Sequence, residues 1–448
     1  MRDLAFLAFL LALFGLGLRR PFLLVLVYVY IDIVAPQRLT YYLLNALQIS
    51  LVAVALAVGG WLIADAKRDV RVAPRQIMIA LLLVYCGLTT MAADFPLEAR
   101  DKWDWVWKAL AFAAFLPLTL RTRLRIEALL LVMVLSASSI IIVGGIKTLA
   151  SGGGYGQLNL MVDNNSGLYE GSTISTVAIA IIPLIAWLAR HQTVFPADWR
   201  VKGFAIALGF ACLLIPVGTS TRTGLVCIAL LALLSLRLVK RRLLYLSALA
   251  ALALVAVPFL PATFTARMST IGSYQADESA STRVAVWKWT WEFAQHNPLG
   301  GGFDAYRQNR IVYDLKDKGA TGDQPKLASD QGRAYHSAYF EMLGEQGWPG
   351  LGLWLLIMVG GLLRMEVLRR RYRTGEQAWA GSLAAALQSA QLVYLLGAAF
   401  IAIAFQPFIY MLIGAQIGLD TYLARRRAEA VPRGFARPAQ PAARHLTA

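Results

Sequence analysis

Long apolar runs separated by short polar clusters dominate the chain. A helix needs about 20 residues to cross a hydrocarbon layer of about 30 Å, and slightly fewer where the membrane thins. These runs lack the strict alternation of half-buried strands. The pattern predicts an all-α, polytopic integral membrane protein with about 12–13 transmembrane helices, because the first two runs are short enough to form one broken hairpin. The thirteen runs are 4–18, 21–36, 42–63, 76–92, 105–120, 128–149, 172–189, 203–219, 224–239, 243–260, 348–363, 381–404 and 407–424.

Composition strengthens this interpretation. Hydrophobic residues make up 58% of the 448 residues and charged residues 15%, whereas soluble globular domains contain about 45–50% and about 25%. Lipid is the medium that accommodates such an apolar surface. Cys86, Cys212 and Cys227 all lie within apolar runs and lack metal-ligand spacing, so we expect neither a disulfide framework nor a metal site.

The net charge of +17 is distributed unevenly along the chain. Of the 43 Lys and Arg residues, 27 fall in clusters that would share one side of the membrane. Positive charge in short loops marks the cytoplasmic side. This accounts for the basic charge, so no nucleic-acid partner is expected. The clusters are Arg19-Arg20, 65–75, 121–127, 190–202, 237–242, 364–373 and the tail from Arg425.

The polar segments on the opposite side divide the chain. Two are short, 151–171 and 219–223, whereas the third, 261–347, carries nine basic and ten acidic residues. A near-neutral segment of this length is expected to fold as a cap, because long structureless loops are uncommon in compact proteins. The expected domains are an N-terminal transmembrane bundle, the cap, the C-terminal transmembrane helices and a disordered basic cytoplasmic tail, at 1–260, 261–347, 348–424 and 425–448.

Two helices are predicted within the cap. The run STRVAVWKWTWEFAQ has apolar residues at helical spacing and is stopped by Asn297-Pro298. A second helix is expected to begin near Tyr335 and to end at the break that starts with Gly347. The NPLGGGF turn between them has backbone N–H groups suited to a phosphate. An ordinary turn is the favoured interpretation, because the lysine and Ser/Thr of a P-loop are missing.

Three arginines on the same side are candidate anion-binding residues. Arg222 lies in the short TSTRTG link between two apolar runs, where a charge near lipid is costly and is therefore a functional candidate. Arg283 begins the tryptophan-rich helix, from which its planar guanidinium group can reach a lipid-linked phosphate. Arg267 is a weaker candidate of the same kind. The structural alternatives are an interfacial arginine at 222 and a solvated surface charge at 283.

His336 is the candidate acid–base residue. It is one of only four histidines, and an unperturbed pKa of about 6.5 suits it to accept a proton from a hydroxyl near neutral pH. A structural role is the alternative for a lone histidine. Helical spacing places Tyr339 on the same helix face as His336, whereas Glu341, five residues after His336, lies off this face. The candidate substrate-binding residues are Tyr339, Glu341, Arg267 and the turn residues Asn164 and Asn165.

The order of several motifs resembles that of the O-antigen ligase/polymerase superfamily. The motifs are TSTRTG between two spans, RMSTI, STRVAVWKWTWEFAQHNPLGGGF, and HSAYFEMLGEQGWPGLGLWLL leading into the next span. With RRPF…PQRLT, KWDWVWK and GGGY…DNN nearer the N-terminus, the chain looks most like the O-glycosylation ligases associated with exosortase A systems. The resemblance covers nearly the whole chain.

This resemblance implies a metal-independent, inverting glycosyltransferase that needs no cofactor, in the bacterial inner membrane. Its donor would be a glycan on undecaprenyl diphosphate, and its acceptor a hydroxyl of lipid A-core, protein or another glycan at the periplasmic face. Matched by motif, Arg222 and Arg283 would neutralise the diphosphate and His336 would act as general base. The cap at 261–347 would then be periplasmic and catalytic, with membrane lipids around the bundle.

Two alternatives stay open at this stage. A polymerase of the same superfamily would extend a glycan repeat instead of passing a finished glycan to another acceptor. A transporter that exports an anionic glycolipid would fit the number of spans, with Arg222 as a substrate site. A large outer cap and the absence of an obvious inverted repeat argue against the transporter.

Overall fold

The computed structural model describes residues 2–40, 44, 47–65, 67, 70–151, 167–196, 198–237, 240–256, 265, 278–315 and 326–430. Helices dominate these ranges. They are α1 (Arg2–Arg19), α2 (Phe22–Val34), α3 (Pro36–Leu39), α4 (Ile49–Ala64), α5 (Pro74–Met91), α6 (Pro96–Thr119), α7 (Arg123–Ser151), α8 (Gly171–His191), α9 (Trp199–Gly218), α10 (Arg222–Ser235), α11 (Arg242–Ala256), α13 (Glu278–His296), α14 (Ala338–Arg371), α15 (Ala378–Ala398) and α16 (Pro407–Ala430).

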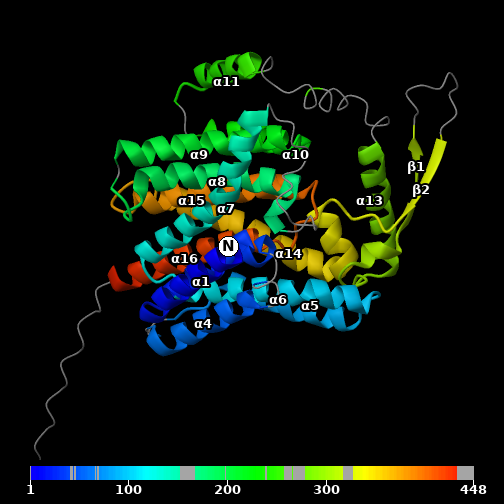
Figure 1. The fold of residues 1–448 in the computed structure, drawn as a ribbon, viewed down its shortest axis with the longest axis horizontal. Helices are drawn as coiled ribbons and strands as arrows, with labels where there is room; N and C mark the ends of the chain where they lie inside the picture. The colour runs from blue at the N-terminus through cyan, green and yellow to red at the C-terminus, as the bar shows by residue number, and fades with distance from the viewer. Residues whose placement is uncertain are drawn as a thin grey trace, which may run out of the picture.

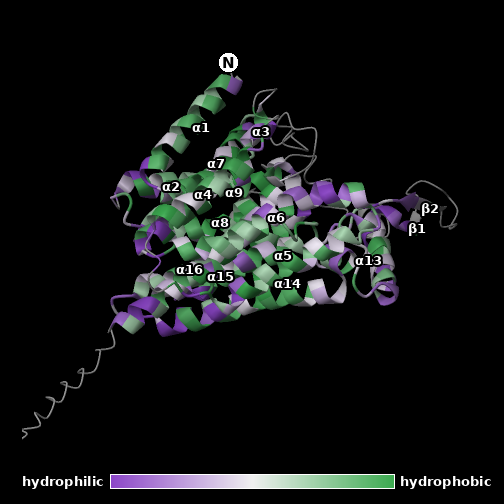
Figure 2. Ribbon diagram, turned by 90° about the horizontal axis from the view of Figure 1, so that it is seen from below, coloured by the Kyte–Doolittle hydropathy of each residue, from purple (hydrophilic) through white to green (hydrophobic). Residues whose placement is uncertain are grey.

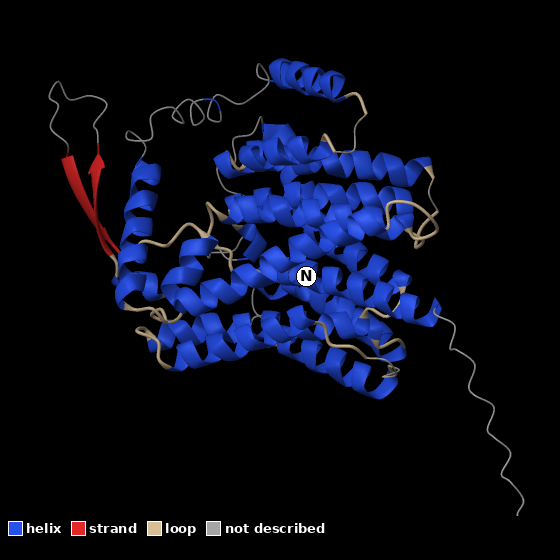
Figure 3. Ribbon diagram, turned by 180° about the vertical axis from the view of Figure 1, so that it is seen from behind, coloured by secondary structure: helices blue, strands red, loops and turns tan. Residues whose placement is uncertain are grey.

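The long helices run side by side as one bundle, with a cap at one end. Figure 1 shows α13 and the strands β1 (Arg310–Leu315) and β2 (Lys326–Gln331) together at this cap end, and the C-terminal end of α16 at the opposite end. The view from behind in Figure 3 shows the same separation. Hydrophobic residues occupy the middle of the bundle in Figure 2, and hydrophilic residues lie toward its ends. This is the distribution that a membrane-spanning bundle requires.

A helix lies at each of the thirteen apolar runs identified in the sequence, so the expected all-α, multi-pass membrane fold is confirmed. Five described helices are long and apolar enough to cross a membrane by themselves: α5, residues 123–150 of α7, α8, α9 and α14. The helices α2, α4 and α10 are apolar but shorter.

The outer face of α5 shows why lipid is the expected surroundings. Every third or fourth residue along this face is a large apolar side chain that is more than half exposed, whereas Leu82 and Cys86 on the other face are fully buried. An apolar stripe of this size is unfavourable in water and favourable against lipid tails. The exposed residues of this stripe are Ile77, Leu81, Val84, Leu88 and Met91.

The core of the bundle is built around α8. It packs against α7, α9, α10 and α15, and 72% of its most apolar segment is buried, against 28% for α9 at the periphery. Small residues permit the close approach, since a Cβ at Gly397 of α15 would lie 2.3 Å from Thr176 Cγ2 of α8. The position of the first turn of α8 is therefore fixed from several sides.

The cap contains a β-hairpin that the sequence interpretation did not foresee. Strands β1 and β2 pair antiparallel, and they are added to the two helices that the sequence predicts for the cap. Ile311 and Tyr313 alternate onto one face, where they form a small buried cluster with Val286 of α13 and with Tyr335. The hairpin forms because this side of α13 needs an apolar cover, and alternating residues supply one.

The two expected cap helices are present. The first is α13, which ends at His296, and the second is the beginning of α14, which kinks at Gly347. Gly347 has φ of 62° and ψ of −165°, a conformation that favours glycine. The kink opens helix carbonyl groups, which the NPLGGGF turn satisfies: Gly301 N donates to Gly344 O (3.0 Å) and Gly302 N to Glu345 O (2.9 Å). This turn therefore has the structural role that was the favoured interpretation.

The kink leads to a test. Replacing Gly347 with Ala would place a Cβ 2.2 Å from Pro298 O and force an alanine into a positive-φ conformation that is almost restricted to glycine, at about 1–3 kcal/mol before the clash is counted. We expect a clearly lower thermal midpoint for the purified protein. Gly352→Ala in the same helix is the matched control, because nothing lies within 4 Å of its Cβ position. Equal midpoints for the two variants would show that the kink is not held in this way.

Candidate active site

His336 lies at the cap end, in the short connection between β2 and α14. Its side chain is exposed to solvent, while the next residue, Ser337, is buried. The backbone of His336 has φ of 48°, which is uncommon for a residue with a side chain. Backbone strain of this kind is concentrated at functional sites, where the surrounding structure holds it in place.

Helix α13 brings Arg283 to the same place. Trp287 Nε1 donates to Tyr335 O over 2.8 Å, and the Trp287 ring stacks on Phe340 with centroids 5.1 Å apart. The face of α13 that carries Trp287 therefore covers the segment that contains His336. Arg283 precedes Trp287 by four residues and shares this face.

Charged groups from other elements act on His336. Although His336 retains exposed surface, the protein around its imidazole displaces part of the surrounding water and lowers its pKa, and the positive charges of Arg283 and Arg333 lower this pKa further. The carboxylate of Glu170 acts in the opposite direction. The ring is consequently neutral at pH 7, and a neutral imidazole can accept a proton.

Glu170 connects the first turn of α8 to this site. Its carboxylate accepts hydrogen bonds from Ser172 N (2.9 Å) and Thr173 N (2.6 Å), which caps the helix. The sequence interpretation overlooked Glu170. The sequence pattern that could have revealed it is an acidic residue followed by Gly-Ser-Thr directly before an apolar run, because this pattern is typical of the start of a helix.

The Arg222 link packs against the same turn of α8. Ser175 Oγ lies 2.8 Å from Thr219 Oγ1 and 2.9 Å from Thr221 Oγ1, so the link and α8 share a buried hydroxyl cluster. Arg222 is the first residue of α10, and the Thr221 side chain makes no capping hydrogen bond to this helix. The start of a helix has unpaired N–H groups and a partial positive charge, which together with Arg222 favour an anion.

The structure therefore places Arg283 near His336, and it places the link that precedes Arg222 against the beginning of α8, which follows Glu170. Three further predicted residues, Arg267, Asn164 and Asn165, lie outside the described residues.

Tyr339 and Glu341 lie beside this region in packing contacts. The Tyr339 hydroxyl donates to Leu395 O over 3.1 Å. Buried Glu341 pairs with Lys102 Nζ at 2.7 Å and accepts from Ala404 N at 2.9 Å. These contacts give both residues structural roles, and substrate binding by them stays a prediction.

Lys102 and Glu345 complete a buried ion cluster that the sequence interpretation did not identify. Lys102 Nζ lies 2.8 Å from Glu345 Oε1 as well as close to Glu341, and Asp304 N donates to Glu345 over 3.1 Å. The cluster joins α6 to the first part of α14. No group of three or more His, Cys, Asp or Glu side chains in the described ranges is placed to hold a metal ion.

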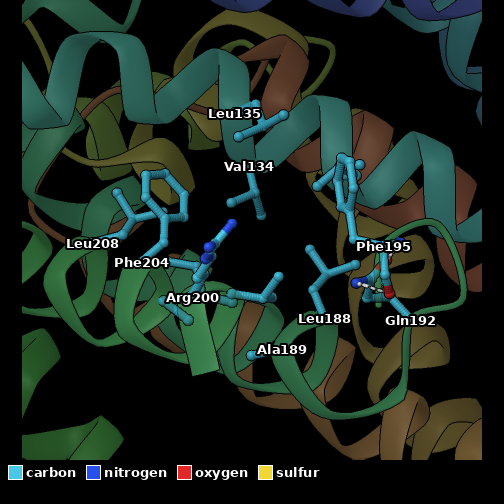
Figure 4. A pocket seen from close by; sticks show the side chains of 13 residues that line it. Val134, Leu135, Leu188, Ala189, Gln192, Phe195, Arg200, Phe204 and Leu208 are labelled. Carbon is cyan, nitrogen blue, oxygen red and sulfur yellow. Dashed lines mark hydrogen bonds between the residues drawn. The ribbon is translucent and has the colours of Figure 1, made fainter. Parts of the chain in front are cut away.

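A cavity of about 390 Å³ lies far from His336, between α7, α8 and α9. Figure 4 shows its apolar lining, with Arg200 projecting toward the middle. Leu188 and Gln192 line it at the C-terminal end of α8, whereas Glu170 lies at the N-terminal end. A helix of this length separates the two places by about 30 Å. The cavity is therefore distinct from the candidate active site.

Two family models match the chain. Residues 204–355 match a family described as O-Antigen ligase, and residues 1–193 match a family of unknown function (DUF5935). A comparison with curated proteins finds no match. The first match contains Arg222, Arg283 and His336, and it supports a membrane enzyme of the O-antigen ligase superfamily.

The ion cluster provides the second test. Lys102→Met would leave two carboxylates buried without their cation, and breaking a buried pair on one side costs about 3–5 kcal/mol. We expect a large drop in the thermal midpoint of the purified protein. Lys288→Met removes an exposed lysine that lies 4.0 Å from Glu292, and it should change stability by no more than about 1 kcal/mol. Similar midpoints in the two variants would contradict a structural role for the Lys102 cluster.

Proposed function

We propose that this protein transfers a glycan from undecaprenyl diphosphate to an acceptor hydroxyl at the periplasmic face of the bacterial inner membrane. The observation that carries the proposal is the position of His336, which lies with Arg283 and Glu170 at one end of a membrane bundle. The match of residues 204–355 to the O-Antigen ligase family supports the same class of reaction.

The arginines would bind the donor diphosphate. Arg283 lies beside His336, and Arg222 stands at the start of α10 next to the first turn of α8. Guanidinium groups bind phosphate oxygens in a bidentate manner. Charge builds up on the diphosphate as its bond to the sugar breaks, so these contacts strengthen in the transition state and accelerate the reaction.

His336 would activate the acceptor. Its neutral imidazole takes the proton of the acceptor hydroxyl as the hydroxyl oxygen forms a bond to the anomeric carbon. The bond between that carbon and the diphosphate oxygen breaks at the same time, and undecaprenyl diphosphate leaves with the electron pair. Attack from the face opposite the leaving group inverts the anomeric centre. The energy of the diphosphate bond drives the reaction.

The periplasmic assignment rests on the charged ends of the helices. Helix α14 begins next to His336 and ends at Arg369, Arg370 and Arg371, while α8 runs from Glu170 to Arg190 and His191. The basic clusters thus lie at the end of the bundle opposite His336. Since basic clusters mark the cytoplasmic side, the candidate active site would face the periplasm.

The acceptor distinguishes a ligase from a polymerase, and we propose a ligase of the O-glycosylation type associated with exosortase A systems.

Purified protein in detergent, without any ion gradient, is incubated with the lipid-linked glycan and with lipid A-core, a protein or a second donor molecule. We expect transfer to the protein acceptor. Transfer to a second donor molecule instead would identify a polymerase. Failure of all three acceptors would contradict a glycosyltransferase and favour a transporter.

The base role of His336 gives the third test. His336→Gln keeps hydrogen bonding but cannot accept a proton at neutral pH, so transfer should fall by about 10²- to 10⁴-fold. Binding of the donor lipid should persist, because the arginines remain. The measurement is the initial rate of transfer, with donor affinity and thermal midpoint as controls for folding. Near-normal transfer would assign His336 a structural role.

The pH profile gives the fourth test. The base must be neutral, so the rate should fall on acidification with a midpoint below about 6.5, the ordinary pKa of histidine. Glu170 raises the pKa of His336, and Glu170→Gln should therefore shift the acid limb to lower pH. Glu292→Gln on the exposed side of α13 is the control and should cause no shift. An acid limb that stays in place or moves upward in Glu170→Gln would contradict this electrostatic arrangement.

A further inference from the structure

The short helix α3 contains two buried polar atoms that lack partners. Arg38 Nη1 and Gln37 Oε1 are both buried without a hydrogen-bond partner. No carboxylate among the described residues lowers the electrostatic cost of the Arg38 charge, and burial lowers the pKa of its guanidinium. Figure 2 shows α3 as a short hydrophilic turn. A buried guanidinium N–H without a hydrogen-bond partner is unfavourable, which makes Arg38 Nη1 a candidate for binding an anion.

Helix α3 is attached close to the candidate active site. The Tyr169 hydroxyl donates to Val34 O at the end of α2, and Tyr169 lies near enough to Arg38 for each group to affect the pKa of the other. Tyr169 directly precedes Glu170, whose carboxylate acts on His336. Helix α2, and with it α3, is thus tied to the Tyr169-Glu170 segment, and Glu170 lies within electrostatic range of His336.

Non-glycine residues with strained, positive φ angles lie at or near the candidate binding residues. Positive φ angles occur at four non-glycine residues in the described part of the chain. Ala35 (φ 48°) joins α2 to α3 and precedes Arg38, Ser220 (φ 51°) precedes Arg222, and the third is His336 itself. The fourth, Asp304, donates its N–H to Glu345 of the buried ion cluster. Strain at Ala35 is consistent with a functional position for the residues that follow it.

We propose that Gln37 and Arg38 form the part of the donor site that holds the first sugar and its diphosphate. Arg38 carries a positive charge and its Nη1 is a donor without a partner, while Gln37 Oε1, on the neighbouring residue, is an acceptor without a partner. A sugar diphosphate presents the complementary groups, an anionic oxygen and hydroxyl donors within a few ångströms of each other. This inference rests on the proposed function, because it specifies how the same donor is bound.

The experiment combines binding and stability on the purified full-length protein. Arg38→Met removes an unfavourable buried charge, so the ligand-free variant should have a thermal midpoint equal to or above that of the wild type. Its dissociation constant for undecaprenyl diphosphate should rise at least tenfold. Gln37→Leu should weaken binding of the lipid-linked sugar and leave binding of bare undecaprenyl diphosphate unchanged. Arg310→Met, at an exposed position of β1, is the matched control and should alter neither affinity.

Each other outcome has a defined meaning. A lower thermal midpoint in ligand-free Arg38→Met would show that Arg38 stabilises the fold, and would overturn the proposal. Unchanged affinity for undecaprenyl diphosphate in this variant would also overturn it, while the proposed function would stand. Absence of donor binding to the wild-type protein would overturn the proposed function and this inference together.

Discussion

The ion cluster of Lys102, Glu341 and Glu345 holds together the parts of the structure on which the site depends. It is buried at the junction of α6 and α14, and each carboxylate receives a backbone N–H as well as the ammonium group. Charges in such surroundings persist only when they are fully paired, so the geometry allows little freedom. Since α14 begins two residues after His336, the cluster fixes where the candidate base lies.

The membrane bundle could be predicted from the sequence because its determinants are local. An apolar run of sufficient length becomes a helix in lipid, since no other local structure satisfies its backbone there. The same holds for α13, where apolar spacing and Asn297-Pro298 define the helix, and for the kink, where Gly347 permits a conformation that other residues avoid. Arg222, Arg283 and His336 could be named as candidates because they lie in the polar segments on the side opposite the basic clusters.

The remaining features depend on contacts between distant parts of the chain. The β-hairpin was missed because six-residue strands give a weak local signal, and its stability comes from Ile311 and Tyr313 packing on α13. Glu170 resembles an ordinary helix cap in the sequence, and only the fold brings it near His336, more than 160 positions away. Arg38 could be noticed only through burial, which a sequence does not display. Pairings such as Lys102 with Glu345 have the same limitation.

The arginines near His336 have a consequence for turnover. A lipid-linked sugar diphosphate carries two negative charges, and cleavage exposes a terminal phosphate that gains a further charge. In the proposed reaction, the positive charges of Arg222 and Arg283 would therefore bind the departing lipid more tightly than the incoming donor. Release of that lipid, rather than bond formation, would then limit the steady-state rate. Accumulated undecaprenyl diphosphate would inhibit the enzyme by occupying the site, so sustained glycan transfer would depend on continuous removal of this product from the outer leaflet.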